Sequence, residues 1–272
     1  MSVDPQPGPD GPPQAATSGA RATLPEAVLF DHDGVLVDSV GPDFQACLRL
    51  FREHGVELPV ERWAREVCGN TDGYSALFGL LSGSVAEGVR TASGPAVPPG
   101  SGSCAPGVAD TAALRARLEG LWQELLVPAN VSLMPGVREL LTRLRGHGIR
   151  LAVASSADRR WVMRWLTHYE LADLFDAVVG GDEVARKKPA PDVYLEALSR
   201  LGASPGRALA VEDSLTGVAA ARAAGLRVVA VPTRYTRSLD YAAADVTVTG
   251  LPLLTDALLD RICREDAHVA QS

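Results

Sequence analysis

Short apolar runs that alternate with longer amphipathic segments are the feature that most constrains how this chain folds. A first run, 27–30, ends in a cluster of acidic residues, and from residue 135 onward the alternation is regular. Short apolar runs bounded by Gly or acids are typical of buried strands, and apolar residues three or four apart are typical of helices. The pattern predicts further strands at 151–154, 177–179, 209–211, 228–231 and 246–248, and helices at 136–146, 158–169, 192–201 and 216–224.

This alternation also predicts the architecture. Strands and helices of these lengths form βαβ units, which build a Rossmann-like parallel sheet with helices on both faces, so the predicted fold class is α/β. Ligands of such sheets bind at the carboxyl ends of the strands. Polar residues that directly follow a predicted strand are therefore the first candidates for a functional site.

Residues 40–134 interrupt the alternation. Apolar residues at helical spacing predict three helices there, around 44–51, 63–67 and 114–125. We therefore predict a helical lobe inserted into the α/β core. The predicted division is a disordered tail at 1–23, a core at 24–39 and 135–260, a lobe at 40–134 with a flexible Gly/Ser/Pro-rich loop at 82–107, and a tail at 261–272.

Composition narrows the class of protein. A formal net charge of −7, only 5% aromatic residues and the absence of a Lys/Arg stripe argue against nucleic-acid binding. The four cysteines lack metal-type spacing and suggest reduced thiols. The first 22 residues do not resemble a signal peptide, and no apolar run reaches the roughly 18 residues of a membrane span. We therefore expect a cytoplasmic protein with neither a nucleic-acid nor a membrane partner.

Two acids follow the first predicted strand. Asp31 and Asp33 can face one site if the chain curls at Gly34, which permits such a curl at little steric cost. Two like charges about 4 Å apart repel by roughly 4 kcal/mol at an effective dielectric constant near 20. The pair therefore needs a cation, a shared proton or exposure to water. Taken alone, the pair is more typical of an acidic surface turn.

A second acidic pair, Glu212 and Asp213, follows the predicted strand at 209–211. Together the two pairs offer the oxygen ligands that Mg²⁺ prefers. The alternative is that Asp213 or Ser214 caps the following helix, and the two roles are compatible.

A hydroxyl and a lysine complete the set of candidates. Ser155 follows the strand at 151–154, where its hydroxyl and backbone N–H could bind a phosphoryl oxygen or cap the next helix. Lys188 precedes Pro189 and Pro191, which stiffen the approach to a helix and so aim the lysine. Single lysines are mostly solvated surface residues, and Lys187 is the better candidate for that role.

These elements, in this order, closely resemble the motifs of the haloacid dehalogenase superfamily. The segments that carry the resemblance are 30–39, 154–156, 188–192 and 211–214, and the match extends from residue 27 to about 250. The inserted helical lobe resembles the cap of the branch that contains β-phosphoglucomutase and phosphoglycolate phosphatase. The resemblance implies a cap that closes over the site.

The resemblance also implies a Mg²⁺-dependent phosphatase for a small phosphorylated metabolite. Asp31 would attack phosphorus to form an aspartyl-phosphate, and Asp33 would protonate the leaving oxygen and then deprotonate water. The metal would be held by the Asp31 carboxylate, the Asp33 backbone carbonyl and Asp213, with Glu212 nearby.

Ser155 and Lys188 would bind the phosphoryl oxygens of that substrate. The presence of Asp33 favours phosphoryl chemistry over carbon–halogen cleavage, because dehalogenases of this superfamily lack the second acid. His32 stands where the family usually has an apolar or variable residue. In an extended segment it points away from its neighbours, so we expect packing or surface exposure rather than catalysis.

One alternative is a β-phosphoglucomutase-type sugar phosphomutase. That enzyme has a His in the segment equivalent to 41–44, where this chain has Asp43, and a cap Arg in the segment equivalent to 69–73, where it has Asn70, Thr71 and Asp72. Acids there would repel the second phosphate of a bisphosphorylated intermediate, which favours hydrolysis. The same four residues are the candidates for substrate specificity.

Two further alternatives are weaker. A non-catalytic binding module would have lost part of the catalytic set, and all of that set is retained. A phosphonate-cleaving enzyme would need a cap lysine, and 40–134 contains no Lys. The motifs leave the substrate undetermined, as well as the choice between monomer and homodimer.

Overall fold

The computed structural model describes residues 24–70, 73–81 and 110–264. The tail predicted at 1–23, the loop predicted at 82–107 and residues 265–272 of the tail predicted at 261–272 lie outside these ranges.

Six strands form one parallel sheet, which confirms the predicted α/β fold class. Their order is β3-β2-β1-β4-β5-β6, so β1 lies in the interior of the sheet between β2 and β4. The bounds agree with the predicted strands to within one residue: β1 Ala27–Phe30, β2 Arg150–Ala154, β3 Ala177–Val179, β4 Ala208–Glu212, β5 Arg227–Ala230 and β6 Val246–Thr247.

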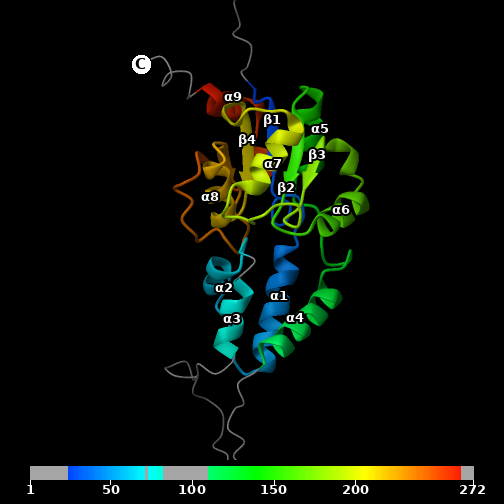
Figure 1. Cartoon of the computed structure of the whole chain (residues 1–272), viewed down its shortest axis with the longest axis vertical. Helices are drawn as coiled ribbons and strands as arrows, with labels where there is room; N and C mark the ends of the chain where they lie inside the picture. Colours follow the sequence, from blue (N-terminus) through cyan, green and yellow to red (C-terminus); the bar gives the residue numbers. More distant parts are fainter. Residues whose placement is uncertain (1–23, 71–72, 82–109, 265–272) are drawn as a thin grey trace, which may run out of the picture.

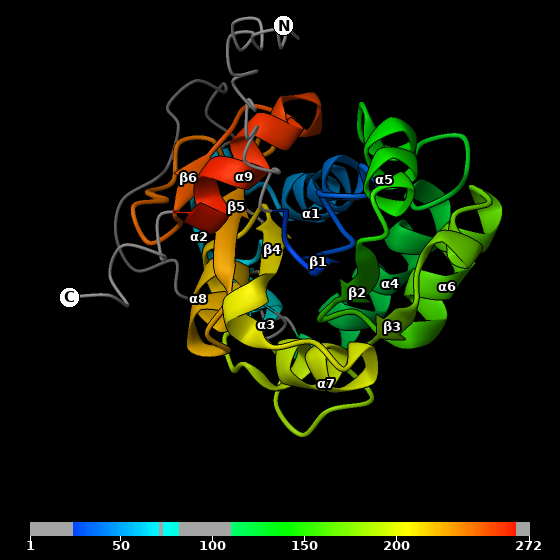
Figure 2. The same ribbon diagram turned by 90° about the horizontal axis from the view of Figure 1, so that it is seen from above.

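Helices cover both faces of this sheet (Figures 1 and 2). Successive strand side chains point to opposite faces. Val28 and Phe30 therefore pack into one buried cluster, and Ala27 and Leu29 into another. The first cluster is completed by α5 Val137–Gly146, α6 Arg159–His168 and α9 Asp256–Arg264, and the second by α7 Asp192–Leu201 and α8 Leu215–Ala223. Burial on both faces explains why the strands are continuous apolar runs.

Between β1 and α5, the described residues form four helices: α1 Val40–Glu53, α2 Val60–Glu66, α3 Gly73–Leu81 and α4 Thr111–Leu125. They enclose an apolar cluster of their own, built around Trp63, Phe78 and Leu121. Figure 1 shows this group beyond the end of the sheet from which β1 leads into α1. The helices therefore stand opposite the carboxyl ends of the strands, and we call them the helical lobe.

Two elements differ from the sequence-based expectation. Helix α3 was not predicted, because its sequence contains Gly73 and Gly79 and Gly is a weak helix former. It folds as a helix while burying Leu77 and Phe78 in the lobe. Helix α9 extends to Arg264, which corrects the predicted end of the core at residue 260. Ile262 is fully buried against the sheet, so the chain continues its core packing past that point.

Three short 3₁₀ helices, η1 Ala172–Leu174, η2 Pro205–Arg207 and η3 Leu251–Leu253, occupy connections between the larger elements. Within the described ranges, no helix combines the length and the apolar character needed to cross a membrane.

Candidate active site

The candidate residues meet where the strands end. Strands β1 and β4 pair in parallel with Phe30 opposite Val211, so Asp31 and Glu212 follow at the same edge of the sheet. The Asp31 N–H donates to the Val211 carbonyl at 3.0 Å, which ties the residue after β1 to β4. The turn that follows needs Gly34, because its φ is +86° and an added Cβ would lie 2.1 Å from the Asp213 carboxylate.

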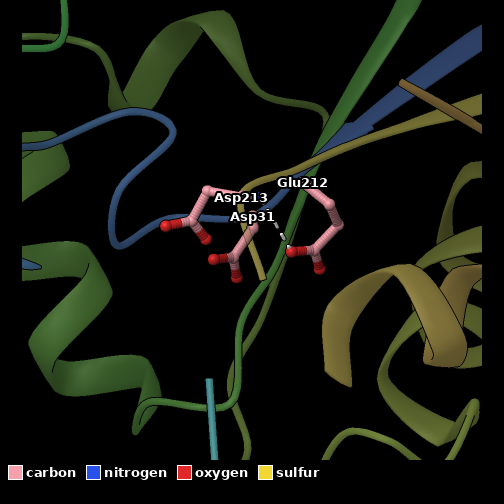
Figure 3. Close-up of side chains that lie close together, drawn as sticks. All are labelled: Asp31, Glu212 and Asp213. Atoms are coloured by element: carbon pink, nitrogen blue, oxygen red, sulfur yellow. Dashed lines mark hydrogen bonds between the residues drawn. The ribbon is translucent and has the colours of Figure 1, made fainter. Parts of the chain in front are cut away.

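Three buried carboxylates form the centre of the site. Asp31, Glu212 and Asp213 each offer an oxygen within 4.8 Å of the others. Figure 3 shows the three side chains converging from the ends of the two strands, with a hydrogen bond from the Asp213 N–H to Glu212 Oε2 at 3.3 Å. The sheet thus brings together acids that are far apart in the chain.

Lys188 lies among these acids and is only 5% exposed. Its Nζ is 2.6 Å from Asp31 Oδ1 and 2.6 Å from Glu212 Oε1. The Tyr194 hydroxyl also donates to Glu212 Oε1, at 2.5 Å, and the ring of Tyr194 lies 5.0 Å from the ammonium. Glu212 and Tyr194 therefore fix the lysine beside Asp31.

The charges in this cluster do not balance. Burial raises the pKa of Asp31 to about 7 despite the attraction of Lys188. Burial, together with the charges of Asp31 and Glu212, raises the pKa of Asp213 well above its usual range. Burial opposes the charge of Lys188, but Asp31 and Glu212 outweigh it and raise the pKa of the lysine. Three acids thus share one ammonium.

Asp213 shows where a cation would fit. Its Oδ2 is buried and has no hydrogen-bond partner among the described residues. A buried carboxylate oxygen without a partner is costly. The three carboxylates provide the hard oxygen donors that suit Mg²⁺, so the residues present match a divalent cation in both charge and chemistry.

Asp33 lies beside this cluster, with 30% of its side chain exposed. Its Oδ1 accepts hydrogen bonds from the Ser39 hydroxyl at 2.5 Å and the Trp161 indole N–H at 3.0 Å. The His32 Nδ1 is 3.2 Å from Oδ2. Burial opposes ionisation of Asp33, but the neighbouring His32 and the hydrogen bonds from Ser39 and Trp161 outweigh it and lower the pKa. His32 is fully buried, in agreement with the packing role expected for it, yet it also contacts the acid.

Ser155 is buried at the end of β2, as predicted, but its polar groups are used differently. Its N–H donates to the Val179 carbonyl at 3.0 Å and so belongs to the sheet, which corrects the expectation that this N–H could bind a phosphoryl oxygen. Its Oγ accepts from the Ala157 N–H at 3.0 Å, and the hydroxyl hydrogen remains to donate to a ligand.

A cavity of about 620 Å³ separates the site from the helical lobe. Asp31, Lys188 and Asp213 lie on its core side, and the lobe contributes further polar and aromatic residues. Residues lining it from the lobe include Asp43, Asn70, Tyr74 and Trp122.

Asp43 is held within the lobe. Its Oδ2 accepts from the Tyr74 hydroxyl at 2.7 Å, and its Oδ1 accepts from the Trp122 indole N–H at 2.6 Å. Burial raises the pKa of Asp43 to about 6 against the effect of these two hydrogen bonds. Asn70 also lines the cavity, and its side chain donates to the Glu66 carbonyl at 3.1 Å. Thr71 and Asp72, the other specificity candidates, lie outside the described residues.

Sequence reasoning did not single out three residues of the site. Ser39 belongs to the first motif, and its hydroxyl was a visible signal. Tyr194 and Trp161 carry no local signal, because each occupies a helix position that is equally typical of core packing.

Comparison with known proteins shows which family and which individual proteins this chain is similar to. A family model described as haloacid dehalogenase-like hydrolase matches residues 25–225. Protein CbbY of Rhodobacter capsulatus is 37% identical over 229 residues, covering 83% of this chain and 93% of its own. A phosphorylated carbohydrates phosphatase of Thermotoga maritima is 30% identical, with coverage of 74% and 82%. The crystal structure of a CbbY variant from Rhodobacter sphaeroides with xylulose-1,5-bisphosphate is 28% identical, with a TM-score of 0.60 and coverage of 84% and 95%.

Proposed function

The chain belongs to the haloacid dehalogenase-like hydrolases, and on this premise we propose that it is a Mg²⁺-dependent phosphatase that acts through an aspartyl-phosphate. The observation that carries the proposal is the position of Lys188, 2.6 Å from both Asp31 and Glu212 in a buried cluster that faces the cavity. A buried lysine among acids at the mouth of a cavity is suited to bind a phosphoryl group.

Asp31 is the nucleophile in this proposal. Its carboxylate oxygen forms a bond to phosphorus while the bond from phosphorus to the ester oxygen breaks. Asp33, which must be protonated in the substrate complex although its pKa is lowered in the free protein, gives that proton to the departing oxygen. In the second step Asp33 removes a proton from water, which attacks phosphorus and releases Asp31 and inorganic phosphate. Lys188 and the Ser155 hydroxyl bind the phosphoryl oxygens throughout.

The metal ligands would be the carboxylates of Asp31 and Asp213 and the backbone carbonyl of Asp33. The unpartnered Oδ2 of Asp213 supports this assignment. When bound, Mg²⁺ supplies positive charge to the phosphoryl oxygens. Glu212 is part of the same acidic cluster, but both of its oxygens accept hydrogen bonds. We assign Glu212 chiefly to holding Lys188.

The substrate in this proposal is a small phosphorylated sugar or a related phosphomonoester. Two relatives support it by their names or ligands: a phosphatase of phosphorylated carbohydrates and a CbbY variant with xylulose-1,5-bisphosphate. The cavity volume of about 620 Å³ can enclose a molecule of that size. Asp43 and Asn70 would select among substrates, since both line the cavity from the lobe. Thr71 and Asp72 remain candidates for the same role.

Hydrolysis is favoured over the phosphomutase reaction. Asp43 replaces the mutase His, and both of its oxygens already accept hydrogen bonds from lobe side chains. An acid fixed in the cavity wall repels the second phosphate of a bisphosphate intermediate. Product analysis with a sugar 1-phosphate would reveal an isomer if the mutase alternative were correct.

The first test is phosphate release from p-nitrophenyl phosphate and from a panel of sugar phosphates, with Mg²⁺ and with EDTA. We expect Mg²⁺-dependent turnover by the wild type, and background rates for Asp31→Asn and Asp213→Asn. Asp176→Asn is the matched control, because Asp176 pairs with Arg145 away from the cavity, and it should retain wild-type turnover. Turnover by Asp31→Asn equal to that of the wild type would overturn the proposal.

A further inference from the structure

We propose that Trp161 is a positioning residue for the acid–base group: its indole N–H fixes the Asp33 carboxyl in the orientation from which it protonates the leaving oxygen. This inference rests on the proposed function, and it names a residue on α6 that lies outside the motifs. Trp161 also lines the cavity.

The contact spans both oxygens of the acid. Trp161 Nε1 is 3.0 Å from Asp33 Oδ1 and 3.3 Å from Oδ2. With 30% of its side chain exposed, Asp33 can exchange these partners for water. A carboxyl group on a short side chain has several rotamers, so a fixed donor restricts it to the subset that reaches the substrate.

The donor itself is rigid. The Trp161 ring packs edge-on against Trp165, with centroids 5.6 Å apart and planes at 77°. The Arg164 guanidinium lies over both rings, 5.7 Å from the centroid of Trp161 and 5.0 Å from that of Trp165. Trp165 is fully buried, and Val162 anchors the helix in the core. The indole N–H is therefore attached to the sheet through packed side chains.

The other hydrogen-bond donor to Asp33, Ser39, lies where the core leads into the lobe. Ser39 directly precedes α1, the first helix of the lobe, and donates to the same oxygen, Oδ1, as Trp161 does. Asp33 is thus joined to the core through Trp161 and to the lobe through Ser39. Trp161 belongs to α6 of the core, so its position relative to Asp31 does not depend on the lobe helices.

If Trp161 orients the Asp33 carboxyl, its loss should affect substrates differently according to their leaving groups. As the bond from Asp31 to phosphorus forms and the ester bond breaks, the departing oxygen takes the electron pair and then the Asp33 proton. An alkyl leaving group needs this proton, because an alkoxide is strongly basic. A p-nitrophenolate leaves without it. Loss of Asp33 orientation should therefore slow transfer from alkyl phosphates and spare transfer from p-nitrophenyl phosphate.

The test compares Trp161→Phe with the wild type on p-nitrophenyl phosphate and on the best alkyl substrate of the sugar-phosphate panel. The quantity is kcat/KM, which reports the steps up to formation of the aspartyl-phosphate. We expect about a 10-fold loss on the alkyl substrate, the size of one hydrogen bond, and little change on p-nitrophenyl phosphate. Trp161→Met also lacks the N–H and should show the same selective loss.

Two controls separate positioning from packing. Tyr169→Phe removes a different donor from the same aromatic cluster, a hydroxyl that donates to the Val131 carbonyl, and should leave the ratio of the two kcat/KM values unchanged. In an Asp33→Asn background, Trp161→Phe should have no further effect on the alkyl substrate, whereas a packing defect would add to it.

The outcomes distinguish this inference from the proposed function. Equal losses on both substrates, or a full additional loss in the Asp33→Asn background, would overturn the role of Trp161 while leaving the phosphatase assignment in place. A wild type without Mg²⁺-dependent turnover would overturn both.

Discussion

The aspartates of this site are suited to different chemical roles because their surroundings differ. Asp31 lies beside an ammonium in a buried cluster, whereas Asp33 accepts hydrogen bonds from neutral donors at the cavity edge. Asp43 accepts from two lobe side chains and yet has a raised pKa, because burial outweighs them. The same carboxyl group is thus suited to attack, to proton transfer or to lining a cavity, depending on its partners.

The raised pKa of Asp43 predicts a pH-dependent contribution to stability. Its pKa in the folded protein is about 6, above the reference value of 3.8, so folding favours the protonated form. The contribution of Asp43 is fully present below about pH 4 and is lost as the pH rises through 6. We expect the unfolding free energy of the wild type, minus that of Asp43→Asn, to fall by about 2 kcal/mol between pH 4 and pH 7. Urea unfolding at several pH values measures this difference.

Asp176 serves as a control, because its contribution to stability should change with pH in the opposite direction to that of Asp43. Burial opposes its ionisation, but the Leu151 N–H and Arg145 lower its pKa, so its stabilising contribution is lost as the pH falls. The difference between the wild type and Asp176→Asn should therefore rise with pH. A flat or rising curve for Asp43→Asn would contradict the assignment for Asp43.

At the scale of elements, α8 begins where the acidic cluster ends. The Ser214 hydroxyl accepts from the Gly217 N–H at 3.1 Å and caps the helix, which confirms the capping role considered for Ser214. The first turn of α8 lies directly against Glu212: a Cβ on Gly217 would be 2.0 Å from the Glu212 carboxylate. Capping and close packing at this helix start together place Glu212 beside Lys188.

This close approach predicts that two Gly→Ala changes in helices have opposite effects. Gly79→Ala in α3 adds a Cβ that meets nothing within 4 Å, and should stabilise the protein by up to about 1 kcal/mol through helix propensity. Gly217→Ala should instead destabilise it by about 1–3 kcal/mol, because Glu212 must move. Urea unfolding measures both. Equal effects of the two substitutions would show that the approach of α8 to Glu212 is not tight.

At the scale of the whole molecule, the core and the lobe are joined beside the cavity by a loop that follows β5. The Tyr235 ring packs against Phe44 and Trp63 of the lobe, with centroids 5.3 Å and 6.0 Å away. Nearby, the Thr216 hydroxyl donates to the Gly69 carbonyl at 2.7 Å. These contacts hold the lobe over the carboxyl ends of the strands, where the cavity forms.

Removal of the Tyr235 ring should weaken this junction. We expect Tyr235→Ala to lower the free energy of unfolding by about 1–3 kcal/mol, since the ring is partly buried among aromatic side chains. Tyr235→Phe keeps the ring and should stay within about 0.5 kcal/mol of the wild type. Chemical denaturation of both variants is the measurement. A Tyr235→Ala variant as stable as the wild type would show that the ring contributes nothing to holding the lobe.

The six strands and the acids that follow them could be predicted because they depend on local chemistry. A strand buried on both faces must be apolar, and a polar residue at its end marks the sheet edge. Helix α3 was missed because its glycines weaken the local signal and its burial is decided by the other lobe helices. The extent of α9 was underestimated for a related reason, since Ile262 is buried by the distant sheet.

The pattern of residues along the chain predicts that Asp31, Ser155 and Asp213 each follow a strand and that Lys188 precedes a helix, and a parallel sheet aligns the strand ends. Which side chain contacts which depends on the packing of the folded molecule. Lys188 lies between Asp31 and Glu212, Tyr194 fixes Glu212, and Trp161 donates to Asp33 across 128 residues of chain. The physical reason is that strand patterns are set by neighbours along the chain, whereas hydrogen bonds between side chains depend on packing between distant segments.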